Sequence, residues 1–375
     1  MTLACIFADI VFTAIIGLPF LLVTAFLLNH LRSFKDLPPG PWALPFVGYT
    51  IFFSKKPQVA LTNLSKKHGH IFSVNIGTET VIVLSSYKII KEALINQANS
   101  FSHRVDFKNI KSTIVSKDKL IATLDDGKDF AFSILGDANF QKTVIESQIT
   151  DEVKCLITTM KFHGGCLQEM DQLIQQSTTN AMCGVFTGHR FDYKDDVLQD
   201  ILKLLVEMSK TVNLLSWKKA LSINIGKFVT STHAEKIDYM SELTKVMSKI
   251  VAKNERELKS GRENTFINVW LAEIEKQGMK IKNHLHRHSL KRQLAGLVIT
   301  NYVFQTNTLL WGLMFLTKHP EIQLKVQNEI DIIIGKERIP TITDIEQMPY
   351  VRATILEIIR MRPILSLHFS YRTLV

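Results

Sequence analysis

An uncharged apolar run near the amino terminus, Ile10–Leu28, limits the possible structure of this chain more than any other sequence feature. A helix over the run would be about 28 Å long at ~1.5 Å per residue, close to the ~30 Å hydrocarbon core of a bilayer. Asp9 precedes the run and Arg32 and Lys35 follow it, which places the downstream side in the cytoplasm. We therefore predict a single-pass membrane anchor over residues 3–29 with a cytosolic body.

A cleaved signal peptide is the alternative to an anchor. The apolar run is long for the core of a signal peptide, no small-x-small cleavage site follows it, and no basic region precedes it. These features favour the anchor, in which Pro19 can kink the helix.

A proline-rich segment, Leu37–Pro41, follows the predicted anchor with the sequence LPPGP. Proline fixes φ and removes backbone donors, so this segment cannot continue the helix. An ordinary proline-rich linker would look the same. We predict a stiff basic and proline-rich hinge over residues 30–45, followed by a globular domain over residues 46–375.

The basic charge balance, a formal net charge of +10, allows three classes of partner. These are nucleic acid, an anionic membrane surface and an acidic protein. Lysine and arginine are scattered, and the sequence has neither a zinc-finger nor an aromatic RNA-binding signature. We therefore predict contact with membrane lipid and no nucleic-acid partner.

The cysteines and histidines do not form a disulfide or metal pattern. The 4 cysteines follow no C-x-x-C spacing, which favours a reducing compartment. His284, His286 and His288 alternate as zinc ligands on a strand could, but they lie in a basic segment between two predicted helices. A solvated loop is the favoured interpretation, and no metal site is predicted.

Hydrophobic periodicity indicates a mainly helical body. The runs His70–Ile76 and Thr80–Leu84 are rich in β-forming residues, and the Gly-Thr-Glu between them is typical of a hairpin turn. From Val144 onward the pattern is almost entirely helical. The predicted fold class is mainly α with a small N-terminal β-sheet.

Several short sequence motifs along the chain are typical of one protein family. They are LPPGP at 37–41 with LPFVG at 44–48, the segment Asn180–Tyr193, KHPEIQ at 318–323, MPY at 348–350 and Glu-x-x-Arg at 357–360. Together they resemble a microsomal cytochrome P-450 that is similar to family 2 (clan 2).

The resemblance implies a cytochrome P-450 fold preceded by one transmembrane helix, in the endoplasmic reticulum membrane. It also implies a heme cofactor, a lipophilic small-molecule substrate and electrons from NADPH-cytochrome P-450 reductase. The family's heme iron needs a cysteine thiolate, in a glycine-rich loop well after its K helix. This sequence reaches Val375 before such a loop, so we expect an incomplete domain.

Two positions near the carboxyl end match the family's pattern. Glu357 and Arg360 lie three residues apart, on one helix face, and correspond to the pair that locks the family's scaffold. Their implied role is structural. His368 follows Pro363 where the family often places a cation against a heme propionate, although an ordinary polar neighbour is an equal alternative.

The segment of this chain that corresponds to the family's I helix lacks the usual motif of that helix. A gapless alignment places Thr300 and Asn301 on the small pair beside the oxygen site, and Val303 and Phe304 on the acid and threonine of the proton relay. Neither Val303 nor Phe304 can relay a proton. Thr300, Asn301 and Phe304 are predicted to face the cofactor. An alignment shifted to place Ala295 on the small pair would misalign the well-matched KHPEIQ segment. It would still place no acidic residue in the proton relay.

The segment that corresponds to the family's C helix also lacks the usual residues. In the family, a Trp and, four residues later, an Arg bind the heme propionates. In this chain Phe130 and Ile134 stand at these two positions. Phe130 is the predicted cofactor contact, but it lacks the indole donor and Ile134 lacks the charge. Cys155 and Cys183 lie in earlier helices and cannot replace the axial ligand.

Two functions remain open. The first is a heme-thiolate monooxygenase that oxidises a lipophilic small molecule with O₂. The second is a non-catalytic, membrane-bound scaffold or decayed copy of such an enzyme. The changes in the C and I helices favour an inactive chain, and no catalytic residue is predicted. Loss of the proton relay alone does not exclude catalysis, because some members of the family that rearrange their substrates also lack this relay.

Overall fold

The computed structural model describes residues 37–43, 48–49, 57–76, 79–101, 103–104, 127–162, 169–215, 238–257, 265–277, 287–364 and 371–372. The predicted anchor, His284, His286 and His368 lie outside these ranges. Among the described helices, none is both long and apolar enough to cross a membrane.

The chain divides into two compact units. The small unit comprises residues 1–106, 215–232 and 367–375, and the large unit comprises residues 107–214 and 233–366.

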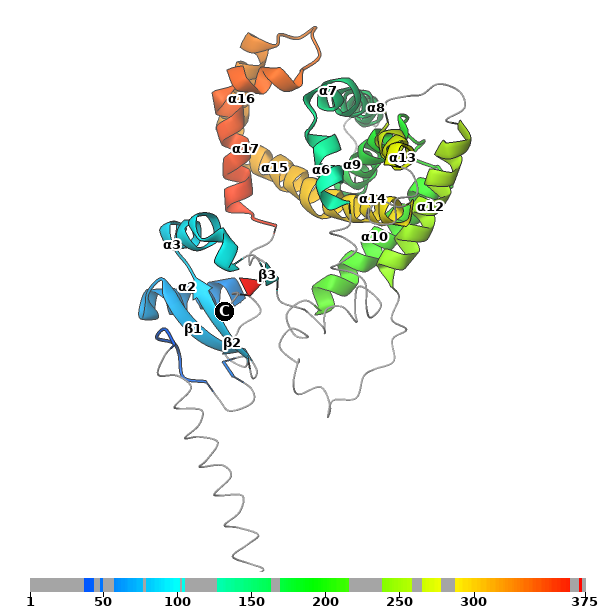
Figure 1. The fold of residues 1–375 in the computed structure, drawn as a ribbon. Helices are drawn as coiled ribbons and strands as arrows, with labels where there is room; N and C mark the ends of the chain where they lie inside the picture. Colours follow the sequence, from blue (N-terminus) through cyan, green and yellow to red (C-terminus); the bar gives the residue numbers. More distant parts are fainter. Residues whose placement is uncertain are drawn as a thin grey trace, which may run out of the picture. The chain divides into compact units, whose positions relative to one another are not determined.

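The small unit is built around an antiparallel hairpin (Figure 1). Its strands pair from Ile71 with Leu84 to Ile76 with Glu79, which confirms the predicted small β-sheet. Phe72 and Val74 point into a small core with Leu64, because alternate strand residues share a face. The described elements are α2 (Pro57–His68), β1 (Ile71–Ile76), β2 (Glu79–Leu84), α3 (Tyr87–Lys91), the π-helical turn η2 (Glu92–Asn96), the 3₁₀ turn η3 (Ala98–Phe101), and the paired strands β3 (His103–Arg104) and β4 (Tyr371–Arg372).

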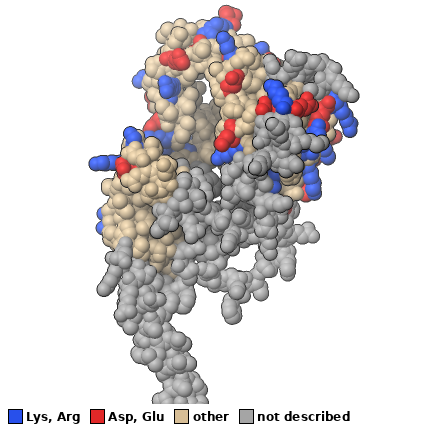
Figure 2. Space-filling model, in the orientation of Figure 1, with Lys and Arg blue, Asp and Glu red and all other residues tan. Residues whose placement is uncertain are grey.

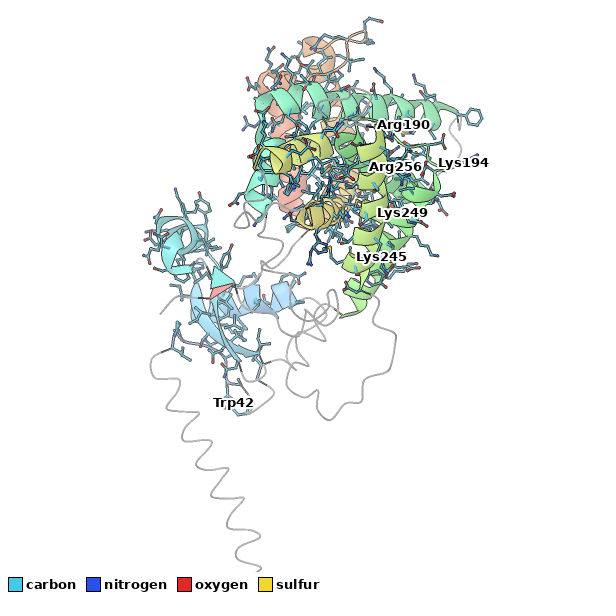
Figure 3. All side chains as sticks on the ribbon, turned by 45° about the vertical axis from the view of Figure 1, so that its right-hand side comes forward. Trp42, Arg190, Lys194, Lys245, Lys249 and Arg256 are labelled. Carbon is cyan, nitrogen blue, oxygen red and sulfur yellow. The ribbon has the colours of Figure 1, made fainter. Side chains whose placement is uncertain are left out.

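The proline-rich segment packs directly on β1. Ser73 donates its backbone N–H to the Pro39 carbonyl at 3.0 Å and its hydroxyl to the Pro38 carbonyl at 2.7 Å. A Cβ on Gly40 would overlap the Ser73 carbonyl, so the close approach requires glycine there. Trp42 extends away from this contact and is 72% exposed (Figure 3). The described part of the predicted hinge is therefore fixed to the sheet.

The described secondary-structure elements of the large unit are all helices or helical turns (Figure 1), which confirms the mainly α fold class. Its helices are α6 (Lys128–Gly136), α7 (Ala138–Phe140), α8 (Glu146–Phe162), α9 (Met170–Thr187), α10 (Asp196–Leu215), α12 (Tyr239–Glu257), α13 (Phe266–Gln277), α14 (Arg287–Asn301), α15 (Asn307–Lys318), α16 (Pro320–Ile333) and α17 (Pro349–Met361). Its other turns are the π-helical η4 (Gln141–Ile145) and η6 (Tyr302–Thr306) and the 3₁₀ helix η7 (Ile342–Gln347).

One continuous core joins elements from α6 to the π turn η6. Along α10 the buried residues Leu198, Ile201 and Leu205 recur at helical spacing, so one face packs inward. Trp270 and Phe266 of α13 are fully buried in the same cluster. Burial of one such aliphatic side chain contributes about 1.5–3 kcal/mol, so this core supplies most of the unit's stability.

A buried carboxylate joins α8 to the end of α9. Glu152 is 1% exposed and accepts hydrogen bonds from Asn180 Nδ2 at 3.0 Å, Arg190 Nε at 3.1 Å and the Tyr193 hydroxyl. Asn180 also exchanges two 2.8 Å bonds with the backbone of Phe191. Burial raises the pKa of Glu152, and the bonds from Tyr193 and Arg190 oppose that rise.

Candidate cofactor site

The predicted I helix is a long helix with a π-helical turn inside it. α14 continues through η6 into α15, and η6 covers Tyr302–Thr306. An inserted π turn widens a helix locally and is often found at functional sites. The turn includes Val303 and Phe304, the positions at which the family's proton relay is expected.

The predicted cofactor residues on this helix face different ways. Thr300 is exposed, with its hydroxyl bonded to the Gly296 carbonyl at 2.8 Å, and Phe304 is 39% exposed. Asn301 is 5% exposed and donates to the Thr178 carbonyl of α9 at 2.9 Å. The open side therefore presents Thr300 and Phe304, while the amide of Asn301 is engaged in the helix core.

The predicted C-helix contact lies on α6. The half-buried ring of Phe130 meets the Trp270 ring edge-on, with centroids 5.1 Å apart. Ile134, one turn further along, is 5% exposed and belongs to the core. A charged side chain at Ile134 would have to be buried among apolar groups, which is costly without a partner.

The Glu357–Arg360 pair forms as its spacing predicts. Arg360 donates from Nε to Glu357 Oε2 at 2.6 Å and from a terminal nitrogen to Oε1 at 2.7 Å. These bonds lower the pKa of Glu357. The side chains are 57% and 68% exposed, so solvent screens the pair and it contributes little to stability by itself. A scaffold role for the pair stays a prediction.

Two contacts that the sequence did not predict hold α17, the helix that carries this pair, against its neighbours. Glu329 of α16 accepts the backbone N–H groups of Tyr350 at 3.1 Å and Val351 at 2.7 Å. The Arg362 guanidinium lies 3.9 Å from the centroid of the Trp311 ring on α15. Pro349 at the start of α17 indicated a helix N-terminus, but no local pattern identified the carboxylate that caps it.

Charge on the visible surface is mixed. In Figure 2 the Lys and Arg side chains of the described residues are interspersed with Asp and Glu. Lys245, Lys249 and Arg256 follow one another along α12 (Figure 3), and Lys245 pairs with Glu242 at 2.7 Å.

The described residues do not fit a thiolate-bound heme. Cys183 is completely buried, and burial raises the pKa of its thiol to about 12, so it stays protonated at neutral pH. Cys155 is half-buried on α8, where the family has no heme ligand. Neither Phe130 nor Ile134 can neutralise a propionate. Within the described ranges, no three histidine, cysteine or acidic side chains gather as metal ligands.

Comparison with known proteins gives the same family over nearly the whole chain. The sequence model of the cytochrome P450 family matches residues 38–373. Cytochrome P450 2F3 of Capra hircus is 29% identical over 370 residues, covering 97% of this chain and 75% of the relative. Cytochrome P450 2J5 of Mus musculus is 31% identical over 358 residues, covering 92% and 70%. The resemblance found in the sequence motifs is confirmed, and the chain belongs to the cytochrome P450 family.

Proposed function

We propose that this chain is a member of the heme-thiolate monooxygenase family that does not catalyse monooxygenation as it stands. The observation that carries the proposal is the burial of Ile134, which is 5% exposed in the core at the position where the family resemblance predicts a propionate-binding arginine. A cofactor carboxylate next to this surface would lose its hydration without gaining a cation.

The second support comes from the π turn. Proton delivery needs an ionisable or hydroxyl group within hydrogen-bond reach of the reacting atom. The turn exposes Phe304, while Thr306, which has a hydroxyl, is 2% exposed and bonded to α9. The open side of the turn therefore lacks a proton relay at the position where relatives are expected to have one.

The proposal also covers the cellular location and the binding partners of this chain. The apolar run Ile10–Leu28 supports a single-pass anchor in the endoplasmic reticulum membrane, with hinge 30–45 and domain 46–375 on the cytosolic side. Family membership supports binding of a lipophilic small molecule and contact with NADPH-cytochrome P-450 reductase. A membrane-bound P-450-like scaffold with partners but no oxygen chemistry is the alternative.

Reduced carbon-monoxide difference spectroscopy tests the proposal. The 375-residue chain is expressed in membranes beside cytochrome P450 2J5 of Mus musculus as a positive control. The control should show the band of thiolate-ligated ferrous heme, and this chain should not. A band typical of imidazole-ligated heme would be compatible with His368. A clear thiolate-type band from this chain would overturn the proposal.

A further inference from the structure

Two buried polar residues of the long helix, Asn301 and Thr306, lie five positions apart and both reach α9. Asn301 is 5% exposed and Thr306 is 2% exposed. Asn301 Nδ2 donates to the Thr178 carbonyl at 2.9 Å, and the Thr306 and Thr178 hydroxyl oxygens are 2.7 Å apart. One residue of α9 therefore receives both contacts.

A regular α-helix could not make both contacts from one face. Residues five apart on an α-helix differ by about 500°, so their side chains point about 140° apart. A π turn closes its hydrogen bonds between residues five apart and so brings such residues to one side. The π turn at Tyr302–Thr306 is therefore the local conformation that lets Asn301 and Thr306 share Thr178.

The hydroxyls form a directed chain. Thr178 Oγ1 lies 2.8 Å from the Ile174 carbonyl, which can only accept, so Thr178 donates there. Thr306 must then donate its proton to Thr178 Oγ1. Each hydroxyl polarises the next, and loss of the Thr178 hydroxyl removes the acceptor of the buried Thr306 hydroxyl.

We propose that Thr178 is a positioning residue that selects the π turn in the long helix. With Asn301 and Thr306 held toward α9, the open side of the turn presents Phe304 and Gln305, which are both exposed. Without the Thr178 hydroxyl, the Asn301 bond to the Thr178 backbone carbonyl remains but the Thr306 hydroxyl loses its partner on α9, so the turn opens more readily toward an α-helix. The face offered to a cofactor or substrate thereby depends on α9.

The inference goes beyond the proposed function, because it holds with or without heme. Hydrogen–deuterium exchange of the purified full chain, without added heme, provides the test. Thr178→Val and Thr306→Val remove the hydroxyl pair and keep the side-chain shape. The matched controls are Thr300→Val and Thr317→Val, whose hydroxyls bond to carbonyls of their own helices outside the turn, Gly296 at 2.8 Å and Leu313 at 2.6 Å.

Exchange in the peptide over residues 302–307 should become roughly tenfold faster in Thr178→Val and Thr306→Val, the factor for one lost buried hydrogen bond. The controls should stay within about twofold of the unaltered chain, and exchange in α13 should not change in any variant. Thr306→Ser keeps the hydroxyl and should restore slow exchange. Equal exchange in the test and control variants would overturn the inference.

Should either valine variant fail to fold, Thr306→Ala and Thr306→Ser separate the outcomes. Alanine removes the hydroxyl without placing a methyl group against it. Faster exchange in the alanine variant alone supports the inference. The same exchange in both variants contradicts it.

Discussion

The Glu329 carboxylate of α16 accepts the backbone N–H of Val351 at 2.7 Å and so caps α17 from a neighbouring helix. Its other oxygen accepts the N–H of Tyr350 at 3.1 Å. The first turn of a helix has donors without intrahelical partners, and a negative charge there also favours the helix dipole. This contact fixes the helix that carries Glu357 and Arg360.

Replacing Glu329 by alanine should lower the free energy of unfolding by about 1 kcal/mol, the usual effect of losing a helix cap. The measurement is urea denaturation followed by circular dichroism. Asp331→Ala is the matched control, because Asp331 is an exposed acid on the same helix. A loss in the control as large as that in Glu329→Ala would show that the cap has no specific effect.

Local patterns predicted part of this architecture. The hairpin followed from β-forming runs around Gly-Thr-Glu, and the Glu357–Arg360 contact followed from i,i+3 spacing on a helix. Both signals lie within a few residues of the structure that they specify. Family motifs supplied the positions of the C and I helices.

The contacts that define the candidate site are long-range. Thr306 and Thr178 are 128 positions apart in the chain, and Asn301 lies 123 from the same partner. Hydrophobic periodicity could not indicate a π turn, because the extra residue is stabilised by α9 rather than by its own sequence. The cap from Glu329 was missed for the same reason, since it lies 22 positions from Val351.

The buried Glu152 should make stability depend on pH. Its pKa is raised in the folded protein, chiefly by burial, from an ordinary value of 4.5. The folded state then binds more protons than the unfolded state, so the free energy of unfolding falls as pH rises from about 4.5 through the folded-state value. Glu152→Gln, which cannot ionise, should flatten the dependence in this window.

Urea unfolding at a series of pH values from ~5 to ~8 measures this effect. Asp151→Asn is the control, because Asp151 is exposed and only 3.6 Å from Lys154 in a surface pair. Its curve should run parallel to that of the unaltered chain. Parallel curves for Glu152→Gln as well would contradict the assignment.

Gly40 should be intolerant of a side chain. Alanine there would overlap the Ser73 carbonyl, so the proline-rich segment must separate from β1 or shift. We expect a loss of about 1–3 kcal/mol in the small unit, as for other overpacked sites. Gly136→Ala is the control, since a Cβ there meets nothing within 4 Å and alanine favours the helix. Limited proteolysis near residues 38–43 should be faster only in Gly40→Ala.

The predicted anchor leads to a membrane test. The chain should remain with membranes after carbonate and high-salt washing, because a spanning apolar helix is held by hydrocarbon burial and not by charge. Removing residues 1–36 should release much of the protein. The remaining bound fraction should decrease with salt, since basic surface contacts with anionic lipid are screened within about 10 Å at 0.1 M salt. Complete recovery of the unaltered chain in the soluble fraction would refute the anchor. Equal retention of both forms after carbonate washing would instead place the membrane contact in the body of the protein.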